Sequence, residues 1–147
     1  MENQVQNGRV EDGLIHLRLN ENDNAVIVFN PADPLFMGKL YDLFAKLEEL
    51  EEKRKQDKKN AEGGKVFDVL RQADREMRSL LDSVLGAGLC DALFPNVSVY
   101  AVADGLPVWQ NLIFFILDKM DDTVIAEQAK TNPRIEKYTK RYQKYKR

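Results

Sequence analysis

The chain has 147 residues and an apolar content of 44%, which fit one domain with a modest core and exclude wholesale disorder. Its net charge of −2 hides an uneven distribution, because residues 131–147 carry +6 and the preceding 130 residues carry −8. The single cysteine excludes an intramolecular disulfide, no apolar stretch approaches the ~20 residues of a membrane span, and the first residues lack a signal-peptide pattern. We therefore expect a cytosolic protein.

The sequence predicts an α+β fold that is mostly helical, with a flexible N-terminus over residues 1–13 and a single domain over residues 14–130. The domain begins with a β-hairpin over residues 14–29, because two apolar, β-branched segments flank the turn-forming residues 20–24. A lone hairpin is only marginally stable in water. It must therefore pack on the helices or pair with another chain, and an unpaired strand edge is a ready partner site.

The first long helix is predicted over about residues 33–56. Asp33 has the character of an N-cap, and Pro34 suits the first helical position. Apolar side chains then recur at alternating steps of four and three, and they are Phe36, Leu40, Leu43, Leu47 and Leu50. We call these five residues the leucine seam, and we predict that it binds a partner. Residues 53–64 are charged and then glycine-containing, and they fit either a solvated helix extension or a flexible arm.

Two further helices are predicted over residues 65–85 and 107–120. The helix over residues 65–85 is amphipathic like the helix over residues 33–56. The apolar sides of these two helices therefore pack on each other within one chain or on another chain. The helix over residues 107–120 is predicted to be largely buried, with an apolar side made by Trp109, Leu112, Ile113, Phe115, Ile116 and Met120. This helix is predicted to end within the polar, acidic segment 118–122.

The basic tail, residues 131–147, is predicted to be helical and to bind a partner. Its tyrosines fall on one helical face, with cations around them, and the candidate binding residues are Arg134, Lys137, Tyr138, Arg141, Tyr142 and Tyr145. Such a segment can be a solvated extension, can dock on an acidic protein groove, or can stack on bases and neutralise phosphates. The acidic body makes nucleic acid the least favoured of these partners, because it repels the phosphate backbone.

No catalytic constellation is present, so we expect no enzyme activity, no cofactor and no metal site. His16 is the single histidine, which gives too few ligands for a structural zinc site, and we expect it on the solvated face of a strand. Cys90 has no neighbouring histidine in the sequence and is expected to be a small buried residue.

Several segments, taken in order, resemble tail assembly chaperones of long-tailed bacteriophages that infect Gram-positive bacteria. They include the strand-to-helix step 29–36, the charged helical arm, the segment 89–94 with 96–98, the turn 104–107, and the start of the tail at 131–138. The resemblance covers most of the chain from about residue 14. It implies a non-enzymatic protein of the host bacterial cytoplasm that binds the phage tape-measure protein and helps to recruit tail-tube subunits.

On this hypothesis the body faces the tape-measure protein, while the tail engages a second partner or another copy of the chain as a homo-oligomer. The alternative is a small nucleic-acid-associated regulator that dimerises through its seam helices and touches phosphates with its tail. A third alternative is a structural oligomer without a client. Salt separates the first two, because phosphate binding by about six charges weakens roughly 10³-fold or more between low and moderate salt.

Overall fold

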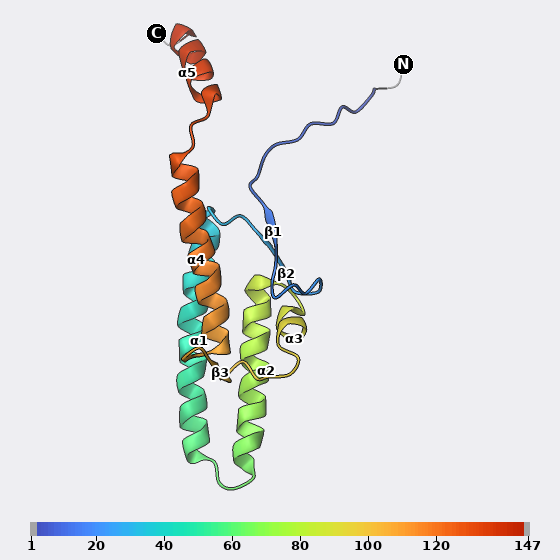
Figure 1. The fold of residues 1–147 in the computed structure, drawn as a ribbon, viewed down its shortest axis with the longest axis vertical. Helices are drawn as coiled ribbons and strands as arrows, with labels where there is room; N and C mark the ends of the chain where they lie inside the picture. The colour runs from blue at the N-terminus through green and yellow to red at the C-terminus, as the bar shows by residue number, and fades with distance from the viewer. Residues whose placement is uncertain (1–2, 146–147) are drawn as a thin grey trace.

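The computed structural model describes residues 3–145, except for the side chains of Tyr142, Lys144 and Tyr145. It is mostly helical with an N-terminal antiparallel hairpin, which confirms the predicted α+β class (Figure 1). The elements are β1 (Ile15–Arg18), β2 (Val26–Phe29), α1 (Pro34–Asn60), α2 (Lys65–Leu85), α3 (Leu89–Leu93), β3 (Val102–Ala103), β4 (Leu106–Pro107), α4 (Val108–Ala129) and α5 (Pro133–Tyr145).

The N-terminal hairpin packs one face on the helices, as its alternating pattern requires. β1 and β2 pair antiparallel, with Ile15 opposite Phe29 and Arg18 opposite Val26. Phe29 is buried, whereas Val28 is half-exposed on the other face. The side chain of Asn22, in the turn, donates to the Ala92 carbonyl of α3 at 2.8 Å, so the turn is bound to the body.

The first two long helices form an antiparallel pair (Figure 1). Asp33 caps α1 as predicted, because its carboxylate accepts the Leu35 backbone N–H at 3.0 Å. α1 continues to Asn60, beyond the predicted end at residue 56, so the charged segment is a helix extension and not an arm. The turn that follows contains Gly63 with a φ of 57°, a left-handed conformation that glycine adopts without steric cost.

α4 differs from the prediction in its length and in one buried residue. It extends to Ala129, well past residue 120, because the acidic side chains of the expected stop lie on its exposed side and leave the helix uninterrupted. Phe115 was predicted to be buried but is 50% exposed. Its neighbours one turn away on the same side are Asp118 and Lys119, which are polar and exposed.

The core lies where the hairpin, α1, α2 and α4 meet. The ring of Phe44 on α1 lies 5.8 Å from that of Trp109 and 5.9 Å from that of Phe114, both on α4. Trp109 is fully buried, and its indole N–H donates to Glu51 of α1 at 3.2 Å. These contacts join α4 to α1. Within residues 3–145, no helix is long and apolar enough to cross a membrane.

Candidate functional site

The leucine seam, predicted to bind a partner, forms part of the core of the folded chain. Leu40, Leu43 and Leu47 are at most 2% exposed and belong to one buried cluster with residues of α2 and α4. Phe36 and Leu50, at the ends of the seam, are partly buried against the same cluster. The seam therefore closes within one chain. A partner of the folded protein therefore cannot reach its three central leucines, whereas Phe36 and Leu50 remain partly accessible.

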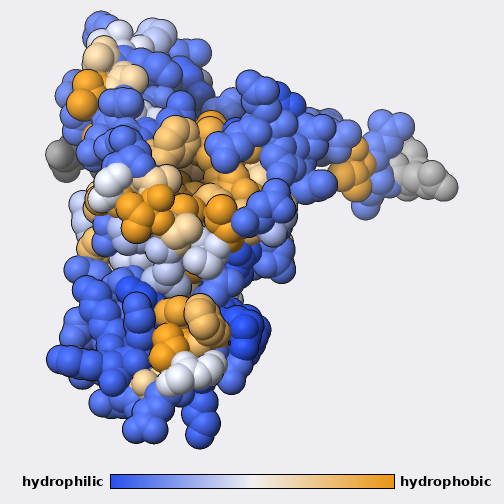
Figure 2. Space-filling model, turned by 60° about the horizontal axis from the view of Figure 1, so that its bottom comes forward, coloured by the Kyte–Doolittle hydropathy of each residue, from blue (hydrophilic) through white to orange (hydrophobic). Residues whose placement is uncertain are grey.

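An apolar groove opens where the hairpin, α3 and α4 meet, and we call it the hairpin groove. It encloses about 370 Å³ and is lined by Arg18, Leu19, Asn20, Leu93, Phe94, Asn111, Leu112 and Phe115. The half-exposed ring of Phe115 provides a large apolar contact at its rim. On the face drawn in Figure 2, apolar side chains gather in separate patches within a hydrophilic surface. Concave apolar surface with a few polar groups is typical of a binding site.

Arg78 of α2 holds α3 and the loop after it, which form one wall of the hairpin groove. Its guanidinium has five acceptors, and they are Asp74 Oδ2 at 2.8 Å, Cys90 O at 3.1 Å, Asp91 Oδ1 at 3.2 Å, Phe94 O at 2.9 Å and Val97 O at 2.7 Å. The other oxygen of Asp74 accepts the Val99 backbone N–H at 2.8 Å. The carbonyls of Phe94 and Val97 both accept from this one side chain, which is 16% exposed, so Arg78 fixes the wall.

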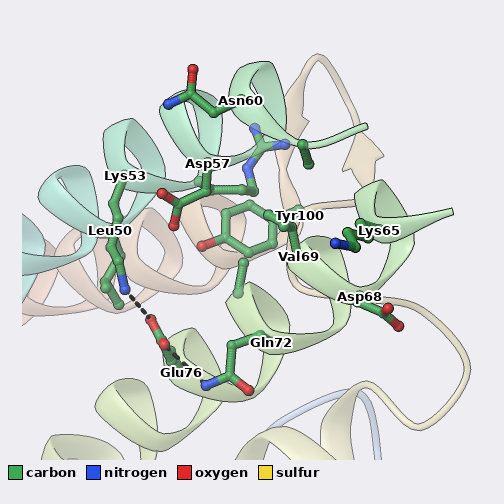
Figure 3. A pocket seen from close by; sticks show the side chains of 13 residues that line it. Leu50, Lys53, Asp57, Asn60, Lys65, Asp68, Val69, Gln72, Glu76 and Tyr100 are labelled. Atoms are coloured by element: carbon green, nitrogen blue, oxygen red, sulfur yellow. Dashed lines mark hydrogen bonds and ion pairs between the residues drawn. The ribbon is translucent and has the colours of Figure 1, made fainter. Parts of the chain in front are cut away.

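A second hollow of about 470 Å³ lies between the distal halves of α1 and α2 (Figure 3). Lys53 of α1 donates to Glu76 of α2 at 3.4 Å, and Gln72 donates to the same carboxylate at 3.0 Å. The Gln72 hydrogen bond, followed by the contact with Lys53, holds the pKa of Glu76 below its usual value. On this side of the hollow, α1 and α2 are therefore joined by the ion pair between Lys53 and Glu76.

Tyr100 enters this second hollow from the loop before β3. The guanidinium carbon of Arg54 lies 4.5 Å from the centre of its ring, and Arg54 also pairs with Glu51 at 2.7 Å. The Tyr100 hydroxyl and Arg54 Nε are buried, and neither has a hydrogen-bond partner among the described residues. Burial, and next the charge of Glu51, raise the pKa of Tyr100. The hollow is lined by charged and amide side chains of both helices, together with Tyr100 and a few apolar residues.

His16 and Cys90 lie in the surroundings that the sequence predicted for them. His16 is exposed on the outer face of β1, and Cys90 is fully buried in α3, as predicted. Burial, with the nearby Asp82 carboxylate, raises the pKa of the Cys90 thiol. The described part of the chain contains no cluster of three or more His, Cys, Asp or Glu residues that could hold a metal ion.

Residues 133–145 of the basic tail form α5, which projects beyond the end of α4 (Figure 1). Lys137 Nζ and the Arg141 guanidinium lie 5.1 and 5.6 Å from the centre of the Tyr138 ring, so the cations and this tyrosine share one side of the helix. Arg134 is exposed in the first turn. The side chains of the other two predicted residues, Tyr142 and Tyr145, lie outside those that the structure describes.

Three of the exposed apolar residues lie on α4 or α5 and were not among the binding residues predicted from the sequence. They are Phe115, Ile125 and Ile135, and the last two are 66% and 69% exposed. Ile135 precedes Tyr138 by three residues, which places both on one helical side, so the spacing contained the signal. Ile125 lies beyond residue 120, where the sequence predicts the helix to end, so the sequence does not assign it to a helical side.

Comparisons of the chain with protein-family models, with curated proteins and with solved structures found no match.

Proposed function

We propose that this protein is a non-enzymatic tail assembly chaperone that binds an amphipathic helical segment of a phage tape-measure protein in the hairpin groove. The observation that carries the proposal is the groove itself, an apolar hollow rimmed by the exposed ring of Phe115. The resemblance in the sequence supports the same class of client and adds the recruitment of tail-tube subunits. Aromatic side chains in concave apolar surface are frequent anchors of protein–protein contacts.

The groove suits a helical client because it lies between a helix, α4, and the turn of the hairpin. A helix laid in such a groove presents apolar side chains at three- and four-residue spacing. Leu93, Phe94 and Phe115 offer the apolar contacts, and Asn111 and Arg18 are polar residues at the margin. The β-hairpin adds a second means of contact, because no third strand pairs with it within residues 3–145.

The charge distribution favours a protein client over nucleic acid. The distal ends of α1 and α2, residues 53–75, hold eight Lys and Arg against four acids, a net of +4. The tail carries +6, and the remaining residues carry −12. The two basic regions lie at opposite ends of the long axis, with the net-acidic remainder of the chain between them (Figure 1). A nucleic-acid-associated regulator remains the alternative, with these basic ends as its contacts.

The test is capture of clients by tagged protein from phage-infected or prophage-induced cells, after nuclease treatment, at low and at high salt. We expect a very long helical protein to be captured at both salt concentrations, with its identity established by mass spectrometry. Phe115→Lys should abolish capture. The matched control is Phe67→Lys on α2, which replaces a phenylalanine that is 64% exposed and outside the groove. If only nucleic acid were captured, and if this capture were lost as the salt concentration rises, the protein would be a nucleic-acid-associated regulator instead.

A further inference from the structure

We propose that α5 of one copy docks on the C-terminal half of α4 of a second copy, through the α4 acidic face, which we define as Asp118, Asp121, Asp122 and Ile125. This self-association does not depend on the client bound in the hairpin groove. It gives a specific role to the basic tail, which the proposed function leaves unassigned.

The first argument is that α5 needs a partner. It has 13 residues, and an isolated helix of this length is marginal in water. Ile135 and Tyr138 lie on one side and are 69% and 49% exposed, so the structure leaves an apolar stripe facing solvent. Lys137 and Arg141 flank that stripe, close to the Tyr138 ring. The helix thus carries an apolar stripe with a cationic border.

The second argument is that α4 carries the complementary surface. Asp118, Asp121, Asp122 and Ile125 are exposed, and their three- and four-residue spacing places them next to one another on one side of the helix. Residues 118–129 carry four acids against Lys119 alone, a net of −3, and the tail carries +6. An apolar residue bordered by carboxylates matches an apolar stripe bordered by cations.

The third argument identifies the occupant as a second copy. Only residues 130–132 connect α4 to α5, and α5 projects past the end of α4 instead of folding back along it (Figure 1). α5 and residues 118–129 are both about 18–20 Å long at 1.5 Å per residue, so one can cover the other. Two copies that exchange these helices form two identical contacts about a two-fold axis.

Cross-linking between two different variants tests the contact directly. One full-length protein carries Ile125→Cys and the other Tyr138→Cys, and the mixture is treated with a short bismaleimide. We expect a covalent heterodimer, and neither variant alone should give this product in comparable yield. Cys90 does not compete because it is buried. Glu49→Cys, at an exposed position on α1, replaces Ile125→Cys as the matched control and should give no heterodimer.

Charge reversal tests the electrostatic part of the contact by analytical ultracentrifugation. Asp118→Lys with Asp122→Lys should weaken dimerisation by about tenfold or more. Lys137→Glu with Arg141→Glu should weaken it similarly, and a mixture of the two variants should recover it. The control, Glu48→Lys with Glu49→Lys, changes the net charge equally at exposed positions of α1 and should leave the dimer intact. A wild-type protein that stays monomeric at high concentration, or a dimer insensitive to both reversals, would overturn the proposal.

Discussion

Replacement of Arg78 by methionine tests whether one side chain holds the wall of the hairpin groove. The guanidinium is largely buried, with 16% of the side chain exposed, and it has five acceptors from Asp74 to Val97. Removal of one partner from a buried charged pair costs about 3–5 kcal/mol, and the loop carbonyls lose their donor as well. We therefore expect the free energy of unfolding to fall by about 3–5 kcal/mol, a large share of the roughly 5–15 kcal/mol typical of a domain.

Arg78→Lys refines this prediction, because a lysine keeps the charge but reaches only one or two of the five acceptors. Its expected cost is about 2–3 kcal/mol, between wild type and Arg78→Met. The matched control is Arg75→Met on the same helix, which is exposed and donates only to Gln72, and it should stay within about 0.5 kcal/mol of wild type.

Two measurements check these values. Urea unfolding followed by circular dichroism gives the free energies, and hydrogen exchange of the folded protein locates the change. Amides over residues 89–99 should exchange faster in Arg78→Lys, while amides of α1 keep their protection. If both Arg78 variants matched wild type within about 0.5 kcal/mol, or if exchange rose equally throughout the chain, the reasoning about this network would be refuted.

Three further predictions concern the cap, the core and the buried thiol. Asp33→Ala should lower the free energy of unfolding by about 1 kcal/mol because the Leu35 N–H loses its acceptor, and Asp33→Asn should retain most of it. Leu43→Ala should cost about 2–5 kcal/mol, whereas Leu35→Ala, at a 78% exposed position, should cost little. For Cys90, folding raises the thiol pKa above its ordinary value of 9.0, so the folded state holds the proton more tightly. The contribution of Cys90 to stability should therefore be constant below that pH and fall as the pH rises above it, so that wild type loses more stability at high pH than Cys90→Ala.

Urea unfolding gives the free energies of unfolding that test the first two predictions. The same measurement, repeated between pH values of about 8 and 10, tests the third. A Leu43→Ala protein as stable as Leu35→Ala would place the leucine seam outside the core. An identical slope with pH in wild type and Cys90→Ala would mean that the thiol is accessible to water. Equal stabilities of Asp33→Ala and wild type would show that α1 begins without its cap.

Local signals in the sequence were sufficient for most of the fold. The hairpin follows from two β-branched segments around the turn at residues 20–24, and the start of α1 follows from Asp33 and Pro34. The ends of the helices were harder to predict. Charged residues such as those at 53–60 and 118–122 are compatible with both helix and loop, so their conformation depends on what the opposite side of the helix packs against.

The hairpin groove, which we propose as the binding surface, could not be located from the sequence. A periodic pattern identifies the apolar side of a helix, but it does not reveal whether that side meets its own chain or a partner. The leucine seam was therefore predicted to bind a partner, although its three central leucines are buried against α2 and α4. The hairpin groove is lined by residues from 18–20, 93–94 and 111–115, and no local pattern brings these segments together.

The sequence by itself determined the element types, the cap of α1 and the opposite charges of tail and body, because these depend on neighbouring residues or on composition alone. Only the tertiary structure decided that the leucine seam is core, that Phe115 and Ile125 face solvent, and that Arg78 binds a loop up to 19 residues away along the chain. These outcomes depend on which surfaces cover one another. Burial is a property of the packed chain, and so the surface left for a partner emerges only when the helices have been packed.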